Sequence, residues 1–309
     1  MYQVILYYKY VKVEDPAGLA ISQKLLCKRL GLIGRIIVAS EGINGTLEGK
    51  TEAIAEYAKA MRNDPMFADM NIKYSQGDGK TFPKLSVKAR SEIVSSHLDG
   101  TVSPLNRTGK YLSSEELHDW FESGKEFYIV DMRNDYETQS GHFEGSILSG
   151  MGNFRDLPKV LDTLADLKNK TILTVCTGGV RCEKASAFLL ENGFADVYQL
   201  KDGIVTYMEK YPNQHFKGKL YVFDQRILIA FNPEDPAHQV IGHCLRCSQF
   251  SERYVNCAND ECHLHFICCE NCAENGRAFC SEKCRETVGS GIVANNLKIS
   301  SRIPAEEFV

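Results

Sequence analysis

The N-terminal third of the chain switches repeatedly between two hydrophobic periods. Residues 2–9 alternate apolar and polar side chains, as a half-buried strand does. Residues 16–30 carry Leu and Ile at helical spacing, and Gly31 is a suitable C-terminal stop. Similar signals predict the elements that follow, which are a hairpin with strands at 35–39 and 45–48 around a turn at 40–44, a helix at 51–62, and strands near 71–75 and 84–90.

This order of elements, βαββαβ, predicts a ferredoxin-like α+β domain over residues 1–110. Two helices would then cover one face of an antiparallel sheet. Acylphosphatases share that fold, and their chemistry needs a glycine-flanked phosphate loop with an arginine just after the first strand. Residues 11–16 of this chain, Val-Lys-Val-Glu-Asp-Pro, lack both features. We therefore expect this domain to be a binding scaffold.

From Ser113 onward the pattern becomes an alternation of helices with short apolar strands. The predicted strands are 127–131, 171–175 and 197–200, and the predicted helices are 113–121, about 158–167, 181–192 and 203–211. Strands joined by crossover helices form a parallel sheet, whose binding sites lie beyond the carboxyl ends of the strands. We therefore predict an α/β domain over residues 111–231, a linker at 231–236, and a separate C-terminal region over 232–309.

The composition is ordinary for a soluble protein, since 43% of the 309 residues are hydrophobic and 25% are charged. This length predicts two or three domains. No apolar run approaches the roughly 18 residues of a membrane span, and the N-terminus lacks the features of a secretion signal. We expect a cytoplasmic protein without a membrane partner. In that reducing compartment, 12 cysteines favour metal binding or catalysis over disulfides.

Positive charge is concentrated in the N-terminal domain, although the whole chain has a formal net charge of -4. Residues 1–110 contain 16 Lys and Arg against 11 Asp and Glu, and the remainder contains 20 against 29. The N-terminal domain is therefore the better candidate for an anionic partner such as nucleic acid. Lys84, Lys88 and Arg90 are the candidate contacts, because their even spacing places them on one face of a strand. The alternative is an ordinary solvated face.

The stretch from Thr171 to Glu183 leads Cys176 out of a β-branched run into a glycine-containing turn that opens a helix. Backbone N–H groups in such a turn, together with the helix dipole, stabilise an anionic sulfur and lower the pKa of a thiol below its free value of about 8.5. We therefore predict that Cys176 is a nucleophile or sulfur carrier, supported by Arg181 and by the loop residues Thr177, Gly178, Gly179 and Val180. The alternative is a buried cysteine at a strand end, which would leave the glycines and the arginine unexplained.

The number of residues between the cysteine and the arginine distinguishes phosphate chemistry from sulfur chemistry. Cysteine phosphatases surround a phosphate with a Cys-x5-Arg loop, whereas Cys176 and Arg181 form a tighter Cys-x4-Arg loop that suits a single sulfur atom. Upstream, residues 129–137 read Ile-Val-Asp-Met-Arg-Asn-Asp-Tyr-Glu and residues 141–147 read Gly-His-Phe-Glu-Gly-Ser-Ile. Together, these segments resemble the rhodanese family over about residues 111–215. The candidate supporting residues in the upstream segment are Asp131 and Arg133.

Four close pairs of cysteines follow the linker. Each pair can clamp one side of a tetrahedral zinc ion, so the pairs predict two structural zinc sites in a segment too small and polar to fold unaided. The pairs are Cys244 with Cys247, Cys257 with Cys262, Cys269 with Cys272, and Cys280 with Cys284. Sequential and cross-braced pairing both stay open, and a ligand could be replaced by Cys268, His263 or His265. Disulfides are the alternative.

The order of the three parts goes beyond a generic rhodanese. A ferredoxin-like unit, a rhodanese-like domain and a cysteine-rich tail together resemble the tRNA uridine hydroxylases, as do residues 34–49 and 82–94. The resemblance implies that tRNA is the partner and that molecular oxygen is the co-substrate for converting a wobble uridine to 5-hydroxyuridine. It also implies that Cys176 is the essential active-site residue, and it leaves open whether this cysteine carries a persulfide.

Two other functions stay open. A sulfurtransferase would load sulfur from a small-molecule or protein donor onto Cys176 and pass it to an acceptor. Cys182, six residues further on, would then resolve the persulfide, or it simply packs in the first turn of the helix. An RNA-binding adaptor without enzymatic activity is the third interpretation, and the reactive-cysteine loop argues against it. We find no dinucleotide fingerprint and no persuasive two-histidine, one-carboxylate iron motif, so hydroxylation rests on the resemblance.

Overall fold

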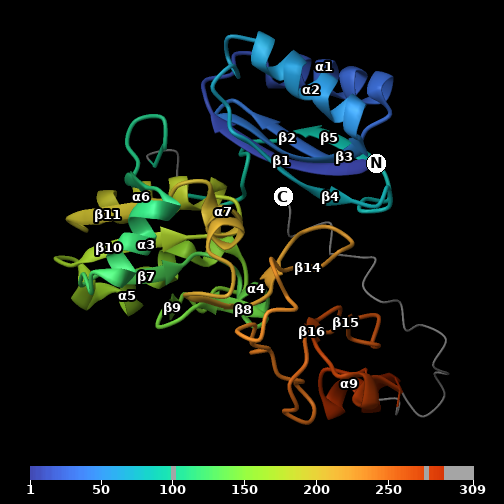
Figure 1. Ribbon diagram of the computed structural model, residues 1–309, viewed down its shortest axis with the longest axis vertical. Helices are drawn as coiled ribbons and strands as arrows, with labels where there is room; N and C mark the ends of the chain where they lie inside the picture. Colours follow the sequence, from blue (N-terminus) through green and yellow to red (C-terminus); the bar gives the residue numbers. More distant parts are fainter. Residues whose placement is uncertain (99–101, 275–277, 289–309) are drawn as a thin grey trace.

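The computed structural model describes residues 1–98, 102–274 and 278–288, which form three parts (Figure 1). The N-terminal elements are β1 (Tyr2–Tyr10), α1 (Pro16–Leu30), β2 (Ile33–Ala39), β3 (Gly42–Lys50), α2 (Thr51–Asn63), β4 (Ile72–Gly77) and β5 (Leu85–Ala89). The strands form one sheet in the order β4-β1-β3-β2-β5, and both helices lie on the face that points away from the rest of the chain. The predicted ferredoxin-like architecture is confirmed.

Two details of this sheet differ from the expectation. The sheet is not antiparallel throughout, because β5 pairs in parallel with β2 at the edge opposite to β4. The chain reverses after β4 and returns at the other edge, which brings β5 into the direction of β2. The hairpin between β2 and β3 is also tighter than expected. Ala39 pairs with Gly42, so that only Ser40 and Glu41 form the turn.

The two faces of the N-terminal sheet have different roles. The face under the helices carries the hydrophobic core, to which β1 contributes Ile5 and β4 contributes Ile72. Because side chains alternate along a strand, Leu6, Tyr8 and Lys73 belong to the opposite, helix-free face. That face is turned toward the central part of the molecule (Figure 1).

The central part contains a five-stranded parallel sheet. Its strands are β6 (Lys110–Leu112), β7 (Tyr128–Asp131), β9 (Ile147–Leu148), β10 (Thr171–Val175) and β11 (Asp196–Leu200), and its longer helices are α3 (Ser114–Glu122), α6 (Val180–Glu191) and α7 (Gly203–Lys210). The order is β6-β11-β10-β7-β9, and all neighbouring strands are parallel, as the crossover helices predicted. Side chains of α3 and α7 share one core on the sheet, and those of α6 belong to another. The predicted domain boundary at residue 111 falls inside β6.

The prediction of one helix around residues 158–167 is wrong. Three short helical segments occupy this region, η1 (Phe154–Lys159), α5 (Val160–Thr163) and η2 (Ala165–Leu167). Pro158 is the fifth residue of η1 and has no N–H to donate, so an α-helix cannot run uninterrupted from η1 into α5. The apolar side chains Leu157 and Leu164 are nevertheless buried in the core that α6 shares.

Short strand pairs and helices make up the rest of the described chain. β8 (Gly141–Phe143) pairs with β12 (Phe216–Gly218), β13 (Leu220–Tyr221) with β14 (Leu228–Ile229), and β15 (Tyr254–Asn256) with β16 (His265–Ile267). The remaining helices are α4 (Asp135–Thr138), α8 (Glu270–Cys272) and α9 (Glu282–Val288). Within the described ranges, no helix is long and apolar enough to cross a bilayer.

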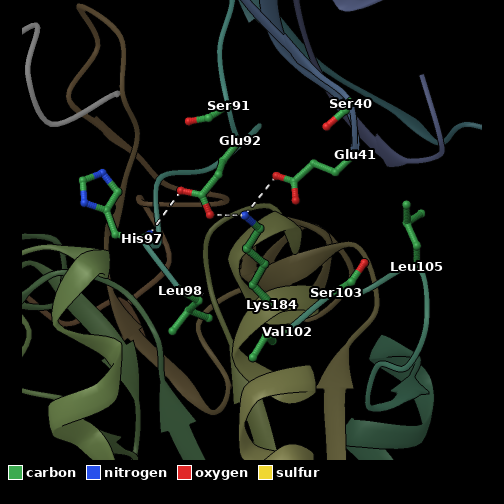
Figure 2. A pocket seen from close by; sticks show the side chains of 10 residues that line it. All are labelled: Ser40, Glu41, Ser91, Glu92, His97, Leu98, Val102, Ser103, Leu105 and Lys184. Carbon is green, nitrogen blue, oxygen red and sulfur yellow. Dashed lines mark hydrogen bonds and ion pairs between the residues drawn. The ribbon is translucent and has the colours of Figure 1, made fainter. Parts of the chain in front are cut away.

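A buried lysine joins the N-terminal and central parts. Lys184 of α6 is 2% exposed, and its ammonium lies 2.9 Å from Glu41 and 2.6 Å from Glu92 (Figure 2). A charge that is removed from water is tolerated only when it is paired. The two carboxylates therefore hold the β2–β3 turn and the segment after β5 against α6.

Candidate active site and cysteine clusters

Cys176 lies in the loop between β10 and α6 and is 0% exposed. The loop begins at the carboxyl end of the central strand of the parallel sheet, where binding sites form. The backbone N–H of Gly179 donates to the Cys176 sulfur over 3.2 Å. The N–H of Cys182, in the first turn of α6, donates to the carbonyl oxygen of Gly179 at 3.0 Å. One amide of the short loop thus points at the sulfur atom.

The first turn of α7 fixes the backbone of this loop from the other side. The N–H of Ile204 donates to the carbonyl oxygen of Cys176 at 3.0 Å, and the N–H of Val205 donates to that of Thr177 at 3.1 Å. The approach is so close that a Cβ at Gly203 would lie 2.6 Å from the Thr177 carbonyl oxygen. The start of α7 can therefore approach the loop this closely because residue 203 is a glycine.

Opposing effects act on the Cys176 thiol. Burial raises its pKa. The pKa is lowered by the S–H of Cys182, by the charge of Arg181 and by the backbone N–H groups of Cys182 and Gly179, and the result is about 6. At neutral pH, Cys176 is therefore mainly a thiolate. Burial and the neighbouring Cys176 raise the pKa of Cys182 well above its usual range, so Cys182 stays a thiol. Cys182 therefore favours the thiolate form of Cys176, and its part in turnover stays a prediction.

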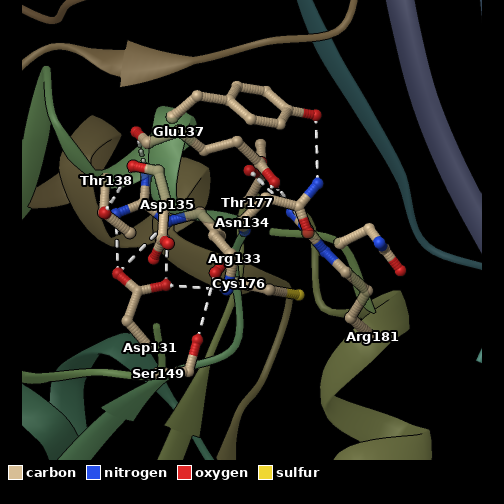
Figure 3. A network of polar contacts seen from close by, with 12 residues as sticks. Asp131, Arg133, Asn134, Asp135, Glu137, Thr138, Ser149, Cys176, Thr177 and Arg181 are labelled. Carbon is tan, nitrogen blue, oxygen red and sulfur yellow. Dashed lines mark hydrogen bonds and ion pairs between the residues drawn. The ribbon is translucent and has the colours of Figure 1, made fainter. Parts of the chain in front are cut away.

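Arg181 is buried beside the loop and forms a two-point ion pair with Glu137 (Figure 3). Its Nη1 lies 2.5 Å from Glu137 Oε1 and its Nη2 lies 2.8 Å from Oε2. Burial lowers the pKa of Arg181, but the Glu137 carboxylate raises it by more, and the guanidinium remains charged. Arg181 therefore supplies a permanent positive charge near Cys176, which Glu137 partly compensates.

Asp131 and Arg133 form a second buried ion pair at the end of β7. Both side chains are 0% exposed, and Arg133 Nη2 lies 2.6 Å from Asp131 Oδ2 and 2.7 Å from the carbonyl oxygen of Gly141. Between them, the N–H of Met132 donates to the carbonyl oxygen of Val175, the residue before Cys176. The structure places these two residues at the edge of the loop, where they form an ion pair with each other and not with the sulfur.

Side chains of the N-terminal sheet close over the Cys176 loop. Tyr10 donates its hydroxyl to the carbonyl oxygen of Val180 at 3.3 Å, and Lys73 donates its ammonium to that of Gly178 at 3.1 Å. Lys73 also lies 3.4 Å from the carboxylate of Asp202. No local sequence pattern indicates Tyr10 and Lys73 as site residues, because Lys73 and Gly178 are 105 residues apart in the chain.

The eight paired cysteines form two groups of four. The first group combines the first pair with the third, and the second combines the second pair with the fourth, so the groups are Cys244, Cys247, Cys269 and Cys272, and Cys257, Cys262, Cys280 and Cys284. Of the two arrangements left open, the structure therefore has the cross-braced one. The sulfurs of Cys247 and Cys269 lie 3.6 Å apart, as do those of Cys262 and Cys280. Two thiolates on one tetrahedral zinc, each bonded at about 2.3 Å, would lie about 3.8 Å apart, so both groups fit zinc.

The three alternative ligands lie outside both groups. Cys268 is buried, and its S–H points to the carbonyl oxygen of Cys269 at 3.7 Å. The Nδ1 of His265 lies 2.9 Å from the Asn256 side-chain oxygen, and its ring stacks on Tyr254. His263 belongs to neither group among the residues that the structure describes.

A further cluster of ligand-type side chains was not recognised in the sequence. His118 and Glu122 lie one turn apart on α3, and His215 joins them from the segment before β12, with one ligand atom of each within 4.8 Å of the others. The helix period brings the first two residues together. His215 arrives through the tertiary fold, and its ring stacks on Phe121. This is a two-histidine, one-carboxylate set, which the sequence analysis did not find, and such a donor set suits divalent transition metals.

The predicted nucleic-acid contacts are all exposed. Only Lys88 lies within β5, while Lys84 and Arg90 directly flank the strand. Leu85 and Val87 pack against the core, so Lys88 belongs to the helix-free face of the sheet. Binding of RNA by these three cations stays a prediction.

The chain matches three protein-family models in succession. Residues 2–93 match the UPF0176 acylphosphatase like domain, residues 113–210 match the rhodanese-like domain, and residues 217–285 match the rhodanase C-terminal model. With the cysteine loop at the end of its parallel sheet, this is a multidomain protein of the rhodanese class. A similar solved structure is a rhodanese-like domain protein from Staphylococcus aureus, which is 29% identical, covers 32% of this chain and 90% of that chain, and has a TM-score of 0.28.

Curated relatives match nearly the whole chain. A tRNA uridine(34) hydroxylase from Cytophaga hutchinsonii is 43% identical, with 92% of this chain and 90% of that protein covered. The protein of the same name from Bacillus pumilus is 42% identical, with 92% and 88% covered. The one from Oceanobacillus iheyensis is 41% identical, with 93% and 88% covered. The chain belongs to the tRNA uridine(34) hydroxylase family.

We predict that alkylation of Cys176 by iodoacetamide titrates with a midpoint near pH 6, because the thiolate is the reacting form and its pKa is about 6. Cys182→Ala should move the midpoint upward, since it removes a donor to the sulfur, whereas Cys182→Ser keeps a donor and should move it less. Mass spectrometry of the tryptic peptide 171–181, which contains no other cysteine, measures the labelling. A wild-type midpoint at the free value of about 8.5 would refute the stabilised thiolate.

We predict about two zinc ions per purified chain, because two groups of four thiolates have the spacing that zinc needs. Cys244→Ser should lower the zinc content by about one ion and destabilise the C-terminal region, while alkylation of Cys176 stays unchanged. Cys268→Ser, a buried cysteine outside both groups, is the matched control and should keep both ions. Elemental analysis that finds no metal, together with oxidised thiols, would contradict the prediction.

Proposed function

We propose that this protein hydroxylates carbon 5 of the wobble uridine, uridine 34, in tRNA. The observation that carries the proposal is the 43% identity, over 92% of the chain, to a relative named tRNA uridine(34) hydroxylase. That similarity extends well beyond the rhodanese-like domain, which accounts for residues 113–210 only. The N-terminal and cysteine-rich parts therefore belong to the unit that carries the function.

The reaction replaces a C–H bond with a C–OH bond, which is a two-electron oxidation of the base. With molecular oxygen as co-substrate, one oxygen atom enters the base and the other leaves as water, which requires two electrons and two protons from a reductant. We assign Cys176, as thiolate or persulfide, to the position next to the base. The loop amides and Arg181 stabilise its charge, and Asp131 and Arg133 position the loop.

Sulfur transfer is the second candidate. In this reaction Cys176 would take sulfane sulfur from a small-molecule or protein donor and release it to an acceptor. The Cys-x4-Arg loop, one residue shorter than the loop of cysteine phosphatases, favours this chemistry. An adaptor without enzymatic activity would have no use for a thiol with a pKa of about 6.

The two groups of cysteines are proposed as structural zinc sites. Four thiolates complete a tetrahedral coordination shell and leave no position for a substrate. The proposed division of labour is a scaffold over residues 1–110, a catalytic domain over 111–231 and a zinc-stabilised region over 232–309. The proposed place of action is the cytoplasm, where tRNA is used.

We predict that Cys176→Ser abolishes the modification while the protein remains folded, because a hydroxyl has nearly the volume of a thiol but forms neither a persulfide nor a low-pKa anion. The measurement is mass spectrometry of wobble nucleosides in tRNA from a deletion strain that expresses the variant. Expression of the wild-type chain should restore 5-hydroxyuridine derivatives, and Cys176→Ser should leave them at background.

Two outcomes would change the assignment. Restoration of 5-hydroxyuridine by Cys176→Ser would remove this cysteine from the reaction. Loss of thiolated nucleosides in place of hydroxylated ones would favour the sulfurtransferase. Cys182→Ser is the matched comparison, because full activity assigns Cys182 to packing, whereas a trapped persulfide on Cys176 assigns it to turnover.

We predict that changing Lys84, Lys88 and Arg90 together to alanine weakens tRNA binding at low salt and reduces the salt dependence by about three phosphate contacts. The control is the triple change of Lys24, Lys28 and Arg29, which removes the same charge from exposed positions on α1. Binding titrations over a range of salt concentrations measure both effects. Equal affinities and slopes for the two triple variants would return Lys84, Lys88 and Arg90 to an ordinary solvated face.

A further inference from the structure

Three side chains of the N-terminal sheet lie against the active-site loop, and we call them the wall of the site. Leu6 and Tyr8 of β1 and Lys73 of β4 lie on the helix-free face of the N-terminal sheet, and all three are placed against residues 178–179. None of the three is fully buried, although the neighbouring Cys176 is. Side chains that are themselves partly exposed to solvent therefore cover the buried sulfur.

The glycines of the loop are fitted to this wall. A Cβ at Gly178 would lie 2.9 Å from Leu6 Cδ2, and a Cβ at Gly179 would lie 2.8 Å from the Tyr8 hydroxyl oxygen. Both distances are well below the roughly 3.5–4.0 Å of a van der Waals contact between carbon atoms. A side chain at either position would therefore displace Leu6 or Tyr8, and at Gly179 it would also meet an unfavourable φ of 102°.

The ring of Tyr8 is held in one orientation. Its hydroxyl donates to Glu183 Oε1 at 3.2 Å, and the Lys73 ammonium lies 5.4 Å from the centre of its ring. Burial, and after it the charge of Glu183, raise the pKa of Tyr8, so the hydroxyl keeps its proton. Glu183 is itself anchored by Tyr111 at 2.9 Å and Gln199 at 3.1 Å. The wall is therefore rigid at its polar end and presents an aromatic surface beside the loop.

We propose that Tyr8, with Leu6 and Lys73 around it, is the surface on which the target pyrimidine base lies when it faces Cys176. The proposal rests on the proposed function, in which a uridine of tRNA is the substrate. Enzymes that act on a nucleobase take it out of its stack and hold it against aromatic or apolar side chains. Lys88 lies on the same face of the sheet, so phosphates and base would be bound by one surface.

Entry of the base requires the wall to separate from the loop, because Cys176 is 0% exposed. The contacts that must lengthen are few. Between the wall and the loop with α6, they are the hydrogen bonds from Lys73 to Gly178, from Tyr10 to Val180 and from Tyr8 to Glu183, and the ion pair between Lys73 and Asp202. Lys184 with Glu41 and Glu92 lies outside this set and can keep the two parts joined while the base enters.

Photocrosslinking tests the proposal on the full-length protein. An anticodon stem-loop RNA with 4-thiouridine at position 34 is irradiated in the complex, and the attached peptide is identified after trypsin digestion. We expect attachment within residues 1–12, which contain Leu6 and Tyr8. Attachment confined to other segments would overturn the proposal, including attachment to the Cys176 loop alone.

Kinetics of two Tyr8 variants provide the second test. Tyr8→Leu removes the aromatic surface and should lower kcat/KM about 10- to 100-fold, the range of one base stacking contact, whereas Tyr8→Phe keeps the surface and should stay within a few-fold of wild type. Tyr2→Leu, on the same strand and the same face but packed on Gly79, is the control and should have no effect. Equal losses in the Leu and Phe variants would show that only the hydroxyl matters and would refute a stacking surface.

The two tests separate this proposal from the proposed function. Crosslinking within residues 1–12 without any hydroxylation by the wild-type protein would retain the base-binding wall and reject the hydroxylase. Hydroxylation by the wild-type protein with crosslinks elsewhere would do the reverse. If Tyr8→Leu does not fold, the crosslink and the Tyr8→Phe variant still decide.

Discussion

Water cannot stabilise a sulfur anion that is fully buried, so fixed groups of the protein must do so. The construction of the central part follows from this constraint. At Cys176 the fixed groups that lower the pKa of the thiol are the Cys182 side chain, the Arg181 guanidinium and the backbone N–H groups of Cys182 and Gly179. Gly179, whose N–H reaches the sulfur, adopts a φ of 102°, a conformation that L side chains rarely accept. The loop is therefore short, glycine-rich and bound on both sides, by α7 below and by the N-terminal sheet above.

Buried charges around the loop are paired so that none of them is isolated. Glu137 balances Arg181, and Asp131 balances Arg133, with all four side chains at most 8% exposed. A partner left alone in such a place would carry the full cost of desolvation, so each pair acts as a unit. The pairs also connect segments, since Arg133 reaches the carbonyl oxygen of Gly141 and Arg181 reaches the short helix α4. Loop geometry thus depends on residues that never touch the sulfur.

The two outer parts contribute in different ways. The cysteine-rich part has a small core made largely of cysteines from the two cross-braced groups. The N-terminal part has a complete core of its own and can use its helix-free face for contacts. That face is held on the central part by contacts of Lys184, Lys73 and Tyr10. The helix-free surface of the sheet therefore lies over the Cys176 thiolate. The N-terminal and central parts therefore form one site.

Local sequence patterns determined most of the element order, the cysteine loop and the four cysteine pairs, because periodicity, turn residues and ligand spacing act over a few residues. They did not determine the three short helical segments over residues 154–167, where one helix was expected. Tertiary structure alone decided the parallel pairing of β5 with β2, the cross-bracing of the cysteines, and the meeting of Tyr8 and Lys73 with the Cys176 loop. These arrangements join segments far apart in the chain, and their free energy comes from packing and desolvation, which no local pattern records.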